Sequence, residues 1–206
     1  MAILVSGSLA YDYIMNFPDA FKNHLLPDQL HILNVCFTVN KLQKSFGGCA
    51  GNIAHTIKLL GGEPIIVSAL GADGADYQER LKRLGLATTH IAQDPERLTA
   101  SAYITTDTDD NQITAFYNGP LELAQHVDLE AILPRPTLAL ISPTNKDAMT
   151  HHLRTGKRLG LTVVFDPGQQ LPAFTSTELE QLLGQADIII GNDYEIKLLE
   201  ERSGWS

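Results

Sequence analysis

The chain has 206 residues and a net charge of −9, with 24 acidic and 15 basic side chains. Its content of 44% apolar and 19% charged residues is typical of a globular protein and excludes a disordered or fibrous one. The acidic balance, without any run of Lys or Arg, argues against nucleic-acid and membrane-surface partners.

The first part of the chain predicts strands followed by a helix. AILVSG at 2–7 is a short apolar run that ends at a glycine, which is typical of a buried strand. A second strand is expected at Tyr13–Asn16, and the stretch 30–46, rich in β-branched and aromatic residues, predicts one or two strands off the main sheet. The motif FGGCAGN at 46–52 then leads into a helix that closes at Gly61-Gly62. Its apolar face is expected to consist of Ile53, Ala54, Ile57 and Leu60.

The rest of the chain alternates apolar strands with amphipathic helices. A polar loop separates two strand-like runs in 101–118, which predicts a hairpin. The other expected strands are 64–70, 88–92, 137–142, 161–166 and 186–191, and the expected helices are 75–84, 146–159, 176–184 and one from 193. This order indicates one doubly wound α/β domain over 1–206, with a mostly parallel sheet covered by helices on both faces. The last strand is expected to leave a bare sheet edge.

Three candidate ligand contacts follow expected strands, and in open α/β sheets ligands lie beyond the carboxyl ends of the strands. Asp12 is either a turn former or a carboxylate that accepts hydrogen bonds from ligand hydroxyls. Gly47-Gly48 and Asn52 form either a flexible turn with a capped helix, or a backbone that approaches a ligand and offers free N–H groups. Asn192 and Glu195 form either a plain capping box or a pair that organises a hydrated Mg²⁺ near a nucleotide.

Several motifs for other functions are missing. The sequence contains neither GxxxxGK[ST] nor GxGxxG, so neither a Walker A loop nor a dinucleotide fingerprint is predicted. Its two cysteines lack metal-binding spacing, and no basic stretch precedes the N-terminal apolar run. A reducing, cytoplasmic location without membrane spans is therefore expected.

Taken together, GSLAYDYI, FGGCAGN and IIIGNDYE resemble the PfkB, or ribokinase-like, family of sugar and nucleoside kinases. FDPGQQ at 165–170 followed by GNDYE is most similar to the bacterial adenosine-kinase branch of that family. The resemblance covers essentially the whole chain. It implies transfer of the ATP γ-phosphoryl group, with Mg²⁺, to a hydroxymethyl group, and adenosine accepting it at its 5′-hydroxyl is the leading expectation.

The resemblance also implies roles for particular residues. Asp12, Gly47, Gly48 and Asn52 would hold ribose or sugar hydroxyls, and Asn192 and Glu195 would lie near Mg²⁺ and the phosphates, with no direct metal ligand. The segments 13–17 and 30–46, with 101–118 as a further candidate, would form a β-lid that excludes water and offers a surface for a homodimer. Phe37 and Phe116 are candidates for stacking on a base, or for core packing.

One departure from the family pattern limits these expectations. The family's DTxGAGD segment, which supplies the catalytic Asp and an anion hole, does not occur in the sequence. We therefore expect this chain to be the N-terminal, substrate-binding part of a kinase, ending before the ATP-binding part, with no catalytic residue and little activity of its own. A sugar kinase acting on ribose or fructose, and a non-catalytic binding module, are the alternatives.

Overall fold

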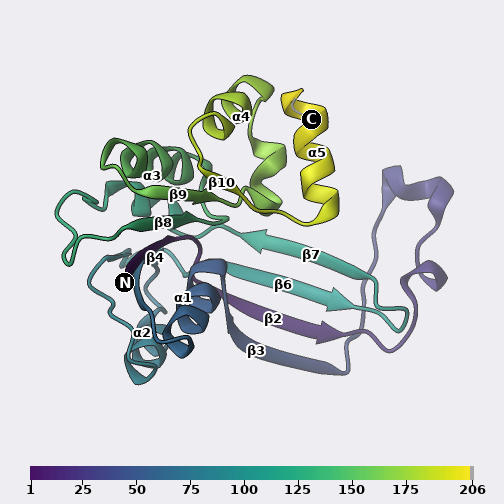
Figure 1. Cartoon of the computed structure of the whole chain (residues 1–206). Coiled ribbons are helices and arrows are strands. Elements are labelled where there is room, and N and C mark those ends of the chain that lie inside the picture. Colours follow the sequence, from purple (N-terminus) through teal and green to yellow (C-terminus); the bar gives the residue numbers. More distant parts are fainter. Residues whose placement is uncertain (205–206) are drawn as a thin grey trace.

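Residues 1–204 are described by the structure, a computed structural model, and they form one sheet covered by helices and a second sheet that projects from it (Figure 1). The first sheet consists of β1 (Ala2–Ser6), β4 (Glu63–Leu70), β5 (Ile91–Gln93), β8 (Leu138–Ile141), β9 (Thr162–Phe165) and β10 (Ile188–Ile189). Its order is β10-β9-β8-β1-β4-β5, and every pairing is parallel. This confirms the expected doubly wound, parallel sheet with β10 at one edge.

Helices cover both faces of the first sheet because neighbouring residues of its buried strands point to opposite sides. On β1, Leu4 belongs to an apolar cluster with Met149 and Leu179, whereas Val5 belongs to another with Ala54 and Tyr77. The first face is covered by α3 (Lys146–Arg158), α4 (Ser176–Leu183) and α5 (Asp193–Ser203). The second face is covered by α1 (Cys49–Leu59) and α2 (Ala75–Arg83).

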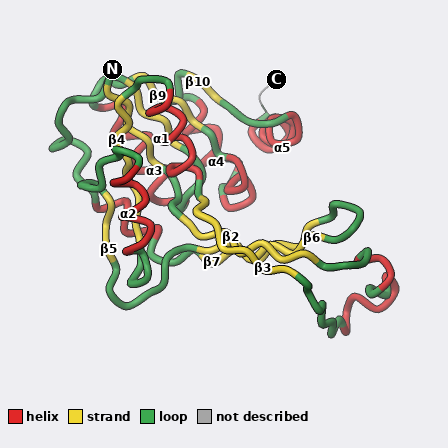
Figure 2. Tube along the Cα trace, turned by 90° about the horizontal axis from the view of Figure 1, so that it is seen from below, coloured by secondary structure: helices red, strands yellow, loops and turns green. Residues whose placement is uncertain are grey.

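A second sheet projects from the first, as Figure 2 shows. It contains β2 (Ala10–Asn16), β3 (Lys41–Gly47), β6 (Ser101–Thr106) and β7 (Gln112–Tyr117), in the order β3-β2-β6-β7. The β6–β7 pair is antiparallel, so the hairpin expected at 101–118 is present. Short 3-10 helices lie at Phe21–Asn23, Pro27–Ile32, Leu121–His126 and Gly168–Ala173.

The strand expected over 30–46 is present only in its last part. Residues 27–32 form a 3-10 helix, 33–39 have no regular structure, and β3 begins at Lys41, paired with Asn16 at the end of β2. Phe17 and Pro18 follow immediately, and a proline has no N–H to continue the ladder. Residues before Lys41 therefore have no partner strand, and strand propensity alone does not hold an extended segment in place.

Smaller differences concern the ends of elements. Leu60, expected on the buried face of α1, is 82% exposed, because the helix ends at Leu59 and the chain turns away at Gly61. The strand expected at 88–92 lies at Ile91–Gln93, and that expected at 186–191 is only two residues long. Within residues 1–204, no helix combines the length and apolarity needed to cross a membrane.

Candidate functional site

The turn before α1 is built on Ser8, which follows β1. The Ser8 carbonyl accepts a hydrogen bond from the Ala50 N–H at 3.0 Å, and its hydroxyl oxygen accepts one from the Cys49 N–H at 3.1 Å. One of the two interpretations of this turn supposed free N–H groups at the helix terminus, but these two are already bonded. Gly48 has a φ of 91°, and a Cβ there would lie 2.5 Å from the Ser8 carbonyl oxygen, so only glycine fits.

Gly47 allows the Asp12 carboxylate to lie against the backbone. A Cβ on Gly47 would come within 2.1 Å of the Asp12 carboxylate oxygen. The Tyr77 hydroxyl, from α2, donates to the Gly47 carbonyl at 2.6 Å and fixes this residue from the other side. The two glycines therefore form the turn and also allow Asp12 to pack against Gly47 and Ser8 to pack against Gly48.

The Asp12 carboxylate is available to a ligand. It is half-buried on β2, and burial raises its pKa. Within the described residues it has no hydrogen-bond or ion-pair partner, and the same holds for the side-chain amide of Asn52. A half-buried carboxylate without a partner is unfavourable in the unliganded protein, so a ligand that donates hydrogen bonds to it gains affinity.

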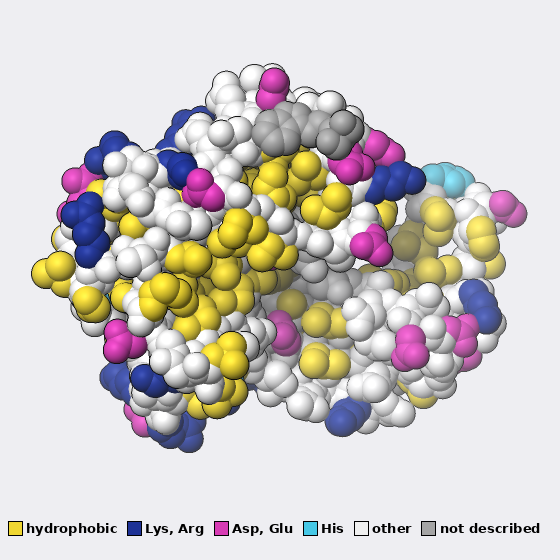
Figure 3. All heavy atoms as spheres, viewed as in Figure 1, with side chains coloured by type: hydrophobic (Ala, Val, Ile, Leu, Met, Phe, Trp, Pro, Cys, Tyr) yellow, Lys and Arg dark blue, Asp and Glu magenta, His cyan; other side chains and the backbone are white. Residues whose placement is uncertain are grey.

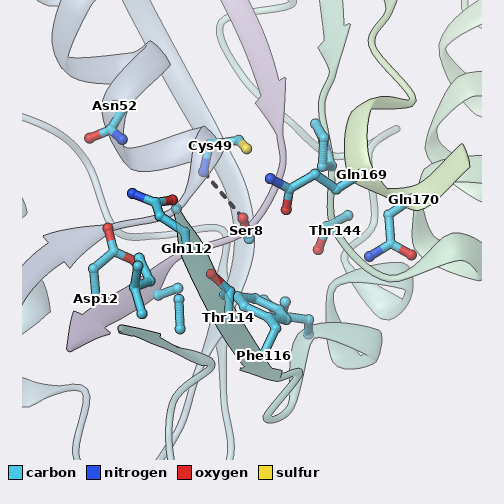
Figure 4. A pocket seen from close by; sticks show the side chains of 16 residues that line it. Ser8, Asp12, Cys49, Asn52, Gln112, Thr114, Phe116, Thr144, Gln169 and Gln170 are labelled. Atoms are coloured by element: carbon cyan, nitrogen blue, oxygen red, sulfur yellow. Dashed lines mark hydrogen bonds between the residues drawn. The ribbon is translucent and has the colours of Figure 1, made fainter. Parts of the chain in front are cut away.

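A cavity of about 400 Å³ lies between the second sheet, the start of α1 and the ends of β1, β8 and β9 (Figure 4). Its size is within the roughly 300–1,000 Å³ usual for small-molecule sites. The residues that line it are Ser8, Ala10, Asp12, Gly48, Cys49, Asn52, Ala102, Ile104, Gln112, Thr114, Phe116, Leu121, Pro143, Thr144, Gln169 and Gln170. Asp12 is the one charged side chain among them.

The second sheet has one face toward this cavity and one away from it, as the two-residue repeat of strands requires. Gln112, Thr114 and Phe116 of β7 line the cavity. Tyr103 of β6 stacks on Tyr13 of β2, with ring centroids 5.0 Å apart, and neither lines the cavity. We call the first of these faces the inner face and the second the outer face.

The structure brings together most of the expected substrate-binding residues. Asp12, Gly48, Asn52 and Phe116 line the cavity, and Gly47 packs against Asp12 just behind it. Phe37 does not line the cavity. It packs against Phe17 and Phe21, with ring centroids 4.8 and 4.9 Å away, in the connection between β2 and β3, which corresponds to its alternative packing role.

Asn192 and Glu195 form a capping box at the start of α5. The Asn192 side-chain oxygen accepts from the Glu195 N–H, and the Glu195 carboxylate accepts from the Asn192 N–H, both at 2.9 Å. Glu195 also acts on Asp166, which follows β9: burial first, and the charge of Glu195 second, raise the pKa of Asp166 to about 6. In residues 1–204 no cluster of three or more metal-ligating side chains occurs.

Sequence reasoning missed the polar residues on the far side of the cavity. Thr144 follows β8, and Gln169 and Gln170 follow β9, so all three obey the strand-end rule that singled out Asp12. Gln112 and Thr114 were missed because a hairpin pattern does not tell which strand face is turned to the ligand.

Comparison with known proteins gives consistent matches. The family described as pfkB family carbohydrate kinase matches this chain over residues 8–206. A nucleoside kinase of Methanothermobacter thermautotrophicus is 30% identical to this chain, over 94% of this chain and 60% of its own length. A protein of Arabidopsis thaliana named probable fructokinase-5 is 28% identical, over 76% of this chain and 53% of its own length. The structure of Burkholderia thailandensis nucleoside kinase in complex with inosine superposes with a TM-score of 0.89 at 38% identity, covering 99% of this chain and 65% of that one.

The chain thus spans about 60% of the length of the nucleoside kinase from Methanothermobacter. The family match extends over nearly all of its residues, and the glycine motif before α1 lies within the matched range. The chain belongs to the pfkB family of carbohydrate kinases.

Proposed function

We propose that this chain forms the substrate-binding part of an ATP-dependent nucleoside kinase, with adenosine phosphorylated at its 5′-hydroxyl. The observation that carries the proposal is the cavity, in which an unpartnered carboxylate, Asp12, faces walls of polar and apolar side chains that carry no other charge. The solved structure with a TM-score of 0.89 is a nucleoside kinase in complex with inosine, which also favours a nucleoside.

The acceptor's sugar would be held at the Asp12 side of the cavity. A carboxylate can accept hydrogen bonds from two neighbouring hydroxyls, and the Asn52 amide can both donate and accept. Asp12, Asn52 and Gln112 lie together on this side in Figure 4. Gly47 and Gly48 would serve the same hydroxyls indirectly, because a Cβ on Gly47 would displace the Asp12 carboxylate and a Cβ on Gly48 would displace the Ser8 backbone.

The remaining walls are suited to a base and poorly suited to a phosphorylated sugar. Phe116, 46% exposed on β7, offers a ring face on which a base can stack. The amides of Gln169 and Gln170 offer both donors and acceptors, as a base edge does. No Lys, Arg or His within the described part of the chain lines the cavity, so a phosphate there would have no cation to pair with.

ATP would supply the transferred phosphoryl group, together with Mg²⁺. Asp166 and Glu195, next to Asn192, are the carboxylates that would hold a hydrated Mg²⁺. Burial, and after it the charge of Glu195, raise the pKa of Asp166, and a cation near both carboxylates would favour the charged form of Asp166. Glu195 keeps one oxygen outside its capping bond for this purpose. The second sheet would act as a lid that excludes water from the acceptor hydroxyl.

The proposal is tested by calorimetric titration of the chain with adenosine, inosine, ribose and fructose. Saturable binding of adenosine, tighter than that of either sugar, is expected because a sugar alone leaves the Phe116 side of the cavity empty. Binding of fructose or ribose without binding of a nucleoside would instead support a sugar kinase, the activity named for the Arabidopsis relative. An absence of binding to all four compounds would refute both functions for this chain.

We further propose that two copies associate through the outer face of the second sheet. This face exposes Tyr103 and Ile113. Figure 3 shows further apolar side chains, more scattered on the projecting part than on the main body of the molecule. Sedimentation equilibrium should then give a dimer that Tyr103→Glu converts to a monomer, without weakening adenosine binding. A monomeric unsubstituted chain at micromolar concentration would contradict the association.

A further inference from the structure

One hydroxyl in the cavity wall is buried without a partner. Thr144 is only 2% exposed, and its side-chain oxygen is the one buried side-chain polar atom of residues 1–204 that lacks a hydrogen bond. Buried hydroxyls are nearly always bonded, because leaving one unpaired costs the full penalty of removing it from water. Since Thr144 lines the cavity, the missing partner can come from a bound ligand.

The chain on both sides of Thr144 is fixed, so the hydroxyl cannot easily turn to another partner. Before it, the Pro143 carbonyl accepts from the Ser8 N–H at 3.0 Å, which ties this segment to the end of β1. After it, the Asn145 side chain caps α3 by accepting from the Asp147 and Ala148 N–H groups. Thr144 is also β-branched, which restricts its side-chain rotation. A rigidly held, unpaired group is what a preorganised ligand contact requires.

The position of Thr144 indicates which part of the ligand it meets. In Figure 4, Thr144 lies with Gln169 and Gln170 on the side of the cavity opposite Asp12 and Asn52. If Asp12 and Asn52 hold the sugar hydroxyls, Thr144 faces the other end of a nucleoside. A hydroxyl can donate to a ring nitrogen or carbonyl and can accept from an amino group, so it can pair with the edge of a base.

We propose that the Thr144 hydroxyl hydrogen-bonds to the base of the bound nucleoside and so favours nucleosides over free sugars. This assignment rests on the proposed nucleoside-binding function. Thr144 is then a specificity-determining residue. Its unpaired hydroxyl lowers the stability of the ligand-free protein, and its hydrogen bond to a base raises the affinity for a nucleoside.

The test is Thr144→Val, which replaces the hydroxyl with a methyl group of similar shape, in calorimetric titrations with adenosine, inosine and ribose. The dissociation constant of at least one of the two nucleosides should rise about 2- to 10-fold, the range for one neutral hydrogen bond, while that for ribose stays unchanged. The melting temperature of the ligand-free chain should rise by about 2 °C or more, because the unpaired polar atom is gone. Thr144→Ser, which keeps the hydroxyl, should bind both nucleosides as the unsubstituted chain does.

Thr99→Val is the matched control. The Thr99 side-chain oxygen is fully buried, accepts from the Gly71 N–H at 3.0 Å, and does not line the cavity. This variant should lower the melting temperature and leave every affinity unchanged.

The possible outcomes separate this inference from the function on which it rests. An unsubstituted chain that binds neither nucleoside refutes the proposed function itself. Nucleoside binding that Thr144→Val leaves unchanged for both adenosine and inosine refutes only the role of Thr144. Equal weakening of nucleoside and ribose binding would place the contact on the sugar and overturn the assignment to the base.

Discussion

The Asp12→Ala variant is expected to bind adenosine about 100-fold more weakly than the unsubstituted chain. The Asp12 carboxylate is half-buried, has no partner within residues 1–204, and lines the cavity beside Asn52. A hydrogen bond to a charged group is worth about 1.5–3 kcal/mol, and a ribose offers two neighbouring hydroxyls. Because 1.4 kcal/mol corresponds to a factor of ten, loss of both bonds at the lower end of this range, about 3 kcal/mol, should cost about two factors of ten.

Two further variants make this experiment specific. Asp12→Asn keeps the shape and one acceptor oxygen but loses the charge, so its affinity should lie between those of the alanine variant and the unsubstituted chain. Asp28→Ala removes the same charge from the exposed connection between β2 and β3, outside the cavity, and should bind adenosine normally. Adenosine affinity that Asp12→Ala leaves undiminished, as measured by calorimetry, would exclude this carboxylate from the site.

The Gly48→Ala variant should be the most destabilised of those considered. At a φ of 91° a side chain is strained, which costs about 1–3 kcal/mol, and the new Cβ would lie 2.5 Å from the Ser8 carbonyl oxygen and 2.7 Å from the Ala10 nitrogen. Overpacking against backbone adds about 1–3 kcal/mol, since the neighbouring atoms cannot move aside. Thermal unfolding should therefore show a melting temperature lower by roughly 5–15 °C.

Gly61→Ala separates the two causes. Gly61 has a similar φ of 81°, but a Cβ there would meet nothing within 4 Å, so this variant carries the strain of the backbone without the contact. Its free energy of unfolding should fall by only about 1–2 kcal/mol. If both variants lose the same free energy of unfolding, the contacts of the new Cβ with Ser8 and Ala10 carry no cost, and backbone strain alone explains the effect of Gly48→Ala.

The parallel sheet could be predicted from sequence because its signals are local. The run at 2–7 and the run at 137–142 are apolar almost throughout, as strands buried on both faces must be, and they correspond to β1 and β8. The helix expected from residue 193 begins at Asp193, and Asn192 and Glu195 supply its capping box within four residues of each other. Such features depend on neighbours in the sequence and not on the rest of the fold.

What could not be predicted depends on partners distant in sequence. Residues 30–40 have the composition of a strand but no strand to pair with, because β2 ends before Pro18. Phe37 was a candidate for stacking on a ligand, and the side chains it meets are Phe17 and Phe21. For Thr144, the position after a strand predicts that the residue lies near a ligand site. That its hydroxyl is buried without a partner follows only from the three-dimensional structure.

The cavity also links the folding of distant parts of the chain. Its walls run from Ser8 to Gln170 and come from the ends of three parallel strands, the start of α1 and the inner face of the second sheet. A ligand that touches all of these binds only the state in which both sheets are in place. Its binding free energy is therefore added to the stability of the whole assembly and not to one element, so a bound substrate acts as a cross-link between the two sheets.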